Sequence, residues 1–188
     1  WSIGAEENRQ VSPFHLAARV LQEQGEGTSP LISGTYPGYE HYYNYFNVGA
    51  SGSTNEEVIR NGLNYAKDHD WHGAYYSILG GAEVISASYI RKGQDTLYLQ
   101  KFNVSPTASN PVYTHQYMQN ISAPTSEALS MKKLYESAGA LENTFVFKIP
   151  VYENMPASPC PMPTSSTNVV LQVPSGYDAS TIYVDGIA

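Results

Sequence analysis

The chain has 188 residues, of which 41% are hydrophobic and 14% charged, a composition typical of a folded protein with one sizeable core. Its formal net charge of −7, with 10 lysines and arginines along the whole length, argues against nucleic acid as a ligand. No apolar run is long enough to span a bilayer, so membrane insertion is not expected.

The first predicted helix begins at Ser12 and Pro13, a capping residue followed by a proline in the first turn, and ends at Gly25. Apolar residues recur along it with the helical period and predict a buried face. That face consists of Phe14, Ala17, Ala18 and Leu21, widened to one side by Leu16 and Val20.

Glu23 lies in the last turn of this helix, where the partial negative charge of the helix end disfavours a carboxylate. It follows Val20 by three residues and therefore shares an apolar flank. Both features favour the protonated acid, and acids of that kind are often catalytic. A solvated acid on a helix end is the ordinary alternative, and it is our interpretation of Glu26, which lies beyond Gly25.

The remaining chain alternates between loops and further predicted elements. Residues 28–52 are rich in Gly, Pro, Ser and aromatics and indicate loops with a short hairpin. Thr54 and Glu57 form a capping box. The further predictions are helices over 54–68, 74–90 and 126–139, a strand or groove wall over 93–104, a short helix over 114–121, and a strand over 145–152.

We predict three parts in the chain. Residues 1–152 form the main domain, which begins abruptly at Trp1 and is interpreted as N-terminally truncated. Residues 153–167 hold four prolines and predict a linker, and 168–188 form a β-like extension or the start of a further domain. The single cysteine, Cys160, cannot form an internal disulfide and is interpreted as a bystander thiol.

Two compositional features bear on function. The sequence "HDWH" (69–72) offers two histidines and an aspartate, but further suitable ligands are not evident, so we expect a solvated helix end and no metal or other cofactor. Sixteen tyrosines stand against five phenylalanines, which favours half-wet surfaces such as carbohydrate clefts or protein interfaces.

Three separated blocks resemble one enzyme family. They are "SPFHLAARVLQEQGEGTSPLISGTYPGYEHYYNYFNVGASG", "SILGGAEVISASYIRKGQDTLYLQKFNV" and "YTHQYMQNISAPTSEA". In this order they resemble the endo-β-N-acetylglucosaminidases of glycoside hydrolase family 73, especially clostridial autolysin catalytic domains. The match covers most of residues 11 to 155.

The resemblance implies an α+β, lysozyme-like fold, with a mainly helical lobe and a small β-hairpin lobe flanking a substrate cleft. It implies hydrolysis of the β-1,4 bond between N-acetylglucosamine and N-acetylmuramic acid in peptidoglycan, with Glu23 as the general acid. Tyr117 and Gln116 match a Gln-Tyr pair opposite the acid, and Phe46 and Asn47 match a block along the cleft floor.

Glycosidases of this type use a second carboxylate. Glu40 is the best local prediction, and Tyr36 is a further predicted sugar contact. Inverting, substrate-assisted and transglycosylase mechanisms stay open, as do a lytic transglycosylase and a non-catalytic glycan-binding module. The expected setting is a secreted, monomeric domain of a larger multidomain protein in the bacterial cell wall, with peptidoglycan strands as its partner.

Overall fold

The computed structural model describes residues 10–154 and 156–158 of the chain. The chain divides into two units, residues 1–148 and 149–188, and the helices of the described part all lie in the first unit. The predicted extension 168–188, Cys160 and most of the predicted linker lie outside the described residues. The domain boundaries drawn from the sequence therefore stay predictions.

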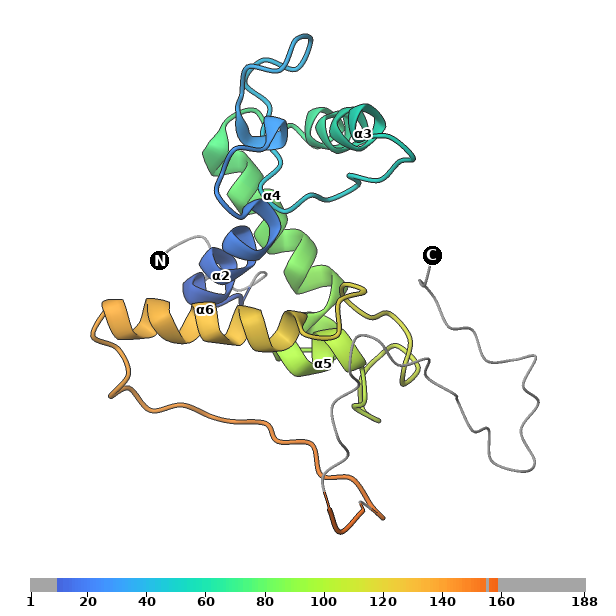
Figure 1. Ribbon diagram of the computed structural model, residues 1–188, viewed down its shortest axis with the longest axis vertical. Coiled ribbons are helices and arrows are strands. Elements are labelled where there is room, and N and C mark those ends of the chain that lie inside the picture. The colour runs from blue at the N-terminus through green and yellow to red at the C-terminus, as the bar shows by residue number, and fades with distance from the viewer. Residues whose placement is uncertain (1–9, 155, 159–188) are drawn as a thin grey trace, which may run out of the picture. The chain divides into compact units, whose positions relative to one another are not determined.

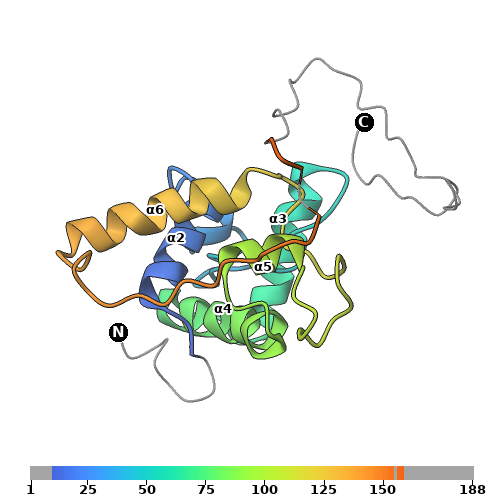
Figure 2. The same cartoon turned by 90° about the horizontal axis from the view of Figure 1, so that it is seen from below.

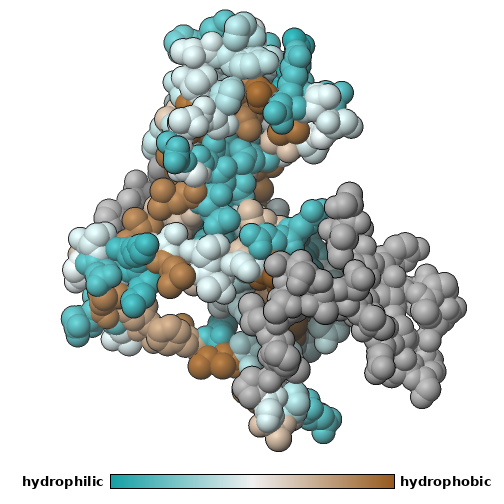
Figure 3. Space-filling view, in the orientation of Figure 1, coloured by the Kyte–Doolittle hydropathy of each residue, from teal (hydrophilic) through white to brown (hydrophobic). Residues whose placement is uncertain are grey.

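The first unit is mainly helical, as expected from the sequence (Figure 1). Its elements in chain order are α2 (Pro13–Gln24), the 3₁₀ turn η1 (Pro30–Ile32), α3 (Asn55–Asp68), α4 (Ala74–Ser88), the 3₁₀ turn η2 (Ile90–Lys92), α5 (Leu97–Phe102) and α6 (Ala123–Ser137). In both ribbon views α6 lies along α2, and α5 also packs on α6 (Figure 2). On the face shown in Figure 3, hydrophilic and hydrophobic side chains are interspersed.

The hairpin expected within residues 28–52 is not seen. Among the described residues this segment consists of turns, η1 and one isolated antiparallel bridge between Tyr42 and His72. The aromatic and glycine-rich composition indicated a loop region correctly, but the backbone pairs at that single bridge and does not form a ladder.

Local chemistry explains where the helices start. Thr54 and Glu57 form the predicted capping box at the start of α3, with each side chain accepting a backbone N–H bond. Thr96 caps α5 by accepting from the backbone N–H of Leu99. Residues 97–102 are therefore helical, and of the two alternatives predicted for 93–104 the strand is wrong. Residues 114–121 form turns without a helix, and 145–152 form no strand.

The core lies where α2 and α4 meet the loop before α3. Its buried cluster is made of Val11, Leu16, Phe46, Ala82 and Ile85. The ring of Phe46 occupies the space that a side chain on Gly81 would fill, since a Cβ atom there would lie 1.9 Å from the ring. Close packing against a glycine therefore fixes Phe46 inside the protein.

The buried face of α2 differs from the predicted one. Leu16 and Ala18 are buried as expected, but Leu21 is 50% exposed and Ala17 is also exposed. The buried positions include three polar residues, His15, Arg19 and Gln24. The side of α2 that is buried differs from the predicted side because α6 packs on α2 and supplies a carboxylate partner for Arg19.

Candidate active site

Glu23 is half-buried in the last turn of α2, and both of its carboxyl oxygens accept hydrogen bonds. Oε2 accepts from Nδ2 of Asn47 at 3.0 Å, and Oε1 accepts from the hydroxyl of Tyr117. These partners are 24 and 94 residues away in the sequence. The fold thus brings together three of the residues singled out in the sequence.

Asn47 is held in place by the end of α2. Its backbone has a φ of +51°, a left-handed conformation that asparagine tolerates better than most residues. Its Oδ1 accepts from Nε2 of Gln24 at 2.9 Å, while its Nδ2 also donates to the backbone oxygen of Glu23 at 3.0 Å. Gln24 donates further to the backbone oxygens of residues 44 and 45. The helix end and the loop are therefore locked to each other beside the Glu23 carboxyl group.

Tyr117 lies on a loop that buried polar side chains of α5 and its C-terminal end hold in place. The backbone N–H of Tyr117 donates to the backbone oxygen of Gln100 at 2.8 Å. Lys101, which is 6% exposed, donates to the backbone oxygen of Met118. Asn103, which is fully buried, donates to two backbone oxygens within residues 111–114. Since this loop has little regular structure of its own, these bonds set the position of Tyr117.

Arg19 lies behind the site, one helical turn before Glu23. Its Nε donates to Oε1 of Glu127 at 2.5 Å, and its Nη2 donates to Oε1 of Gln100 at 2.7 Å. The guanidinium carbon lies 3.7 Å from the centre of the Tyr117 ring, a cation–π contact. One buried cation thus contacts α5, α6 and the Tyr117 ring.

Burial controls protonation around this cation. The pKa of Tyr117 is raised by burial and by its bond to Glu23, against the opposing effect of Arg19, so its hydroxyl stays protonated. Burial raises the pKa of Glu127 despite its ion pair with Arg19, and the nearby Glu23 adds to this. Burial, helped by Arg19, lowers the pKa of His15 to about 3, so this ring is neutral at ordinary pH.

The other residues predicted for the site have partners outside the Glu23, Asn47 and Tyr117 cluster. Phe46 is 7% exposed and packs in the core, and its contact with substrate stays a prediction. Tyr36 is half-buried in a surface turn, with its ring 6.1 Å from that of Tyr39. Gln116 is exposed, and its Nε2 donates to the backbone oxygen of Phe102 at 3.3 Å.

Glu40 is exposed in the turn that follows Tyr36. Its Oε1 accepts from the backbone N–H of Gly38 at 3.1 Å. Its own backbone N–H and that of Gly38 hold the pKa of its carboxyl group below the usual value. Glu40 is therefore an ionised carboxylate at neutral pH.

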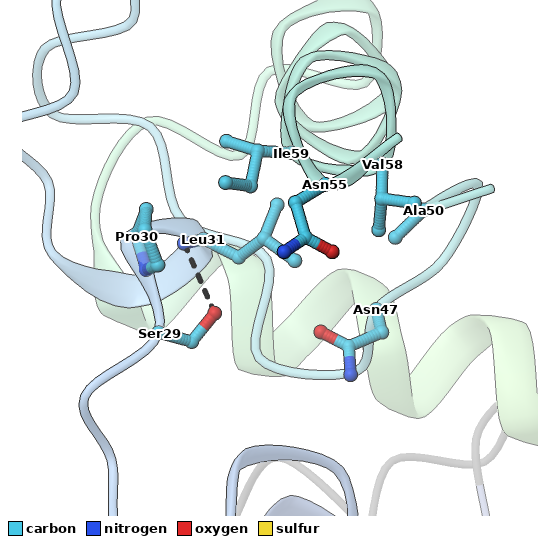
Figure 4. Close-up of a pocket in the computed structure, with 8 residues that line it drawn as sticks. All are labelled: Ser29, Pro30, Leu31, Asn47, Ala50, Asn55, Val58 and Ile59. Atoms are coloured by element: carbon cyan, nitrogen blue, oxygen red, sulfur yellow. Dashed lines mark hydrogen bonds between the residues drawn. The ribbon is translucent and has the colours of Figure 1, made fainter. Parts of the chain in front are cut away.

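A pocket of about 490 Å³ adjoins the cluster through Asn47 (Figure 4). Its wall is mainly apolar, and the side-chain amides of Asn47 and Asn55 lie on opposite sides of it. The lining residues come from η1, from the loop before α3 and from α3: Ser29, Pro30, Leu31, Asn47, Ala50, Asn55, Val58 and Ile59. Asn47 therefore links the Glu23 carboxyl group to an opening of the size that ligand sites have.

Sequence reasoning missed Arg19, Glu127 and Gln100. Arg19 precedes Glu23 by four residues, so the two share one side of the helix. This spacing could have indicated that Arg19 lies near the acid. Glu127 and Gln100 carried no local signal, because their importance comes from pairing with a residue 108 and 81 positions away.

Neither clusters of metal ligands nor membrane-spanning helices are found in the described part of the chain. There, no group of three or more His, Cys, Asp or Glu residues could hold a metal ion. No helix in the same range is both long and apolar enough to cross a membrane.

The chain is similar to bacterial autolysins, although no protein-family model matches it. It is 32% identical over 152 residues to a bifunctional autolysin of Staphylococcus epidermidis (strain ATCC 12228 / FDA PCI 1200) and 30% identical over 151 residues to one of Staphylococcus aureus (strain MSSA476). Each match covers 76% of this chain and 11% of the relative. The chain thus spans about a ninth of the length of these curated relatives.

Solved structures agree with this similarity. A crystal structure of a catalytic mutant of S. aureus Autolysin E, with a glutamate replaced by alanine, is in complex with the disaccharide NAG-NAM. It has 30% identity and a TM-score of 0.57, and the match covers 73% of this chain and 58% of that one. Autolysin E in complex with the muropeptide NAM-L-Ala-D-iGlu matches with 31% identity, the same TM-score and the same coverage.

Proposed function

Because this chain belongs to the autolysin glucosaminidases of glycoside hydrolase family 73, we propose that it hydrolyses the glycan strands of peptidoglycan. The bond cleaved is the β-1,4 linkage between N-acetylglucosamine and N-acetylmuramic acid. The observation that carries the proposal is the Glu23 carboxyl group, held between the Tyr117 hydroxyl and the Asn47 amide at the end of a helix. A neighbouring structure that loses a catalytic glutamate and binds a NAG-NAM disaccharide supports the same chemistry.

Glu23 acts as the general acid. Protonated Glu23 gives its proton to the glycosidic oxygen as the bond breaks, and its carboxylate then accepts from Tyr117 and Asn47. Hydrogen bonds to an ionised group are stronger than neutral ones, so these two donors stabilise Glu23 most at the moment when it has lost its proton. Tyr117 suits this role because its hydroxyl keeps its own proton.

Glu40 is the carboxylate that directs water in this proposal. It is ionised at neutral pH and exposed on a turn of the segment that faces α3, which suits a general base better than an acid. The turn-rich segment 28–52 takes the place of the expected hairpin lobe as the second wall of the cleft. Tyr36 in this segment and Gln116 in the loop after α5 are the further sugar contacts in this proposal. The pocket beside Asn47 offers space for the glycan to extend.

The setting of the enzyme follows from its substrate. We place the chain outside the cell, at the wall, as one monomeric domain of a longer protein. Its net charge of −7 would repel anionic wall polymers, so other modules would anchor it to the wall.

The test compares Glu23→Gln with the parent on purified peptidoglycan. We expect the parent to release reducible N-acetylglucosamine ends, detected by mass spectrometry after borohydride reduction, and Glu23→Gln to release almost none. The matched control is Glu26→Gln, an exposed acid just beyond the same helix, which should keep parental activity. Equal release by Glu23→Gln would contradict the assignment of the acid, and 1,6-anhydro products from the parent would indicate transglycosylation.

A further inference from the structure

A buried ion pair lies directly behind the proposed catalytic residues. The side chains of Arg19 and Glu127 are 3% and 2% exposed, and their charged atoms are 2.5 Å apart. Removing two charges from water is costly, and a well-packed apolar pair in the same space is often at least as stable. Stability alone is therefore a weak reason for an arginine and a glutamate at these positions.

The contacts of Arg19 add to the backbone bonds that hold the loop of Tyr117. The guanidinium lies against the Tyr117 ring at 3.7 Å and donates to the side chain of Gln100 at 2.7 Å. The backbone oxygen of Gln100 in turn accepts the N–H of Tyr117 at 2.8 Å. A planar guanidinium can form in-plane hydrogen bonds while its face stacks on a ring, which an ammonium group cannot do. Arg19 thus contacts the ring of Tyr117 and the side chain of the residue that bonds its backbone.

Glu127 balances the charge that this arrangement requires. Without it, Arg19 would be an unpaired cation in the interior, which is strongly destabilising. The ionisable groups that interact with Arg19 are Glu127, Tyr117, Tyr89 and His15, of which His15 is neutral. The pair therefore supplies a rigid, directional contact to Tyr117 with little net charge beside the acid.

We propose that Arg19 and Glu127 are positioning residues of the glycosidase, which hold the Tyr117 hydroxyl at the Glu23 carboxyl group by a neutral, buried ion pair. This inference rests on the proposed function of Glu23 and Tyr117. It assigns no contact with substrate to either member of the pair. Its consequence is that the pair contributes to turnover through Tyr117.

The main test replaces both charges at once, in the variant Arg19→Met with Glu127→Met. An apolar pair leaves no unpaired buried charge, so thermal unfolding should show a folded protein. We expect kcat on soluble glycan strands to fall about a hundredfold, the scale of a loss of ångström-level positioning, while KM changes little. Adding Tyr117→Phe to this variant should lower kcat far less than it does in the parent, because the pair acts through the same hydroxyl.

Controls separate this role from general packing. Arg91 and Glu83 form another pair at 2.5 Å, but their side chains are 42% and 44% exposed, and replacing both by Met should leave kcat unchanged. Arg19→Lys keeps the charge and loses the planar fork, and we expect a folded protein with a kcat between those of the parent and the double variant.

The outcomes discriminate clearly. Parental kcat in the double variant, or in Arg19→Lys should the double variant fail to fold, overturns the inference. The inference is also overturned if Tyr117→Phe lowers kcat by the same factor with and without the pair, because that result indicates a merely structural role for the pair. An inactive parent chain would instead contradict the proposed function.

Discussion

Removing the hydroxyl of Tyr117 tests the centre of the proposed site, because Tyr117→Phe deletes one donor and keeps the ring. The ring still packs on Arg19, so the loop position should persist. The lost bond is one from a protonated hydroxyl to the Oε1 atom of Glu23, whose negative charge develops as the proton leaves. A hydrogen bond to a charged group contributes about 1.5–3 kcal/mol. At about 1.36 kcal/mol per tenfold change in rate, kcat/KM should fall roughly 10- to 150-fold.

The assay is the release of reducing ends from soluble glycan strands over a range of concentrations. We expect the loss to appear in kcat, because the hydroxyl stabilises Glu23 more after proton transfer than before it. The matched control is Tyr113→Phe, a hydroxyl on the same loop whose residue is 69% exposed, which should behave as the parent. A Tyr117→Phe variant with parental kcat/KM and a parental melting temperature would refute the role of this hydrogen bond.

The fold makes three further predictions. The His15 ring has a pKa of about 3 in the folded chain against 6.5 ordinarily, so the unfolded state binds its proton first and stability falls as pH drops below 6.5. Between pH 6.5 and 4 this contributes a loss of about 3 kcal/mol, and urea unfolding of His15→Gln should show a shallower decline with acid. Gly81→Ala should lower the free energy of unfolding by about 1–3 kcal/mol, because its Cβ would meet the Phe46 ring, and a calorimetric melting temperature equal to the parent's would contradict this. Thr54→Ala removes the capping box of α3 and should cost about 1 kcal/mol in chemical denaturation, whereas Thr107→Ala, in the turn after α5, serves as a control with little effect.

The sequence predicted those helices whose ends depend on local chemistry. The capping residue Thr54 and the proline at the start of α2 act on the nearest few peptide groups, so their effects could be deduced without the fold. The helix α5 was predicted as a strand or groove wall. It has only six residues, and its buried polar side chain and the residue that caps its C-terminal end bond to a loop farther along the chain. Hydrogen bonds to a distant loop cannot be predicted from the periodicity of apolar residues within a segment.

The arrangement of the site was less accessible than the presence of its parts. Glu23 could be singled out by its place on the helix, but only the family resemblance pointed to Tyr117, which lies 94 residues away. The hairpin expected near Glu40 rested on composition as well as on the resemblance, and the described residues there form turns with a single bridge. Phe46 was expected to line the cleft floor. Gly81 on α4 leaves room for its ring, which packs in the core.

The polar side of α2 explains why the predicted apolar face was incomplete. His15, Arg19 and Glu23 recur every four residues and therefore form one stripe along the helix. Within this stripe His15 and Arg19 are buried, which is tolerated because Glu127 of α6 pairs with Arg19 and because the His15 ring is neutral. Leu21, on another side, is left half-exposed as a result. The helix thus buries less apolar surface and places charged and polar groups next to Glu23. This is expected of a helix that positions an acid for proton transfer and also packs the core.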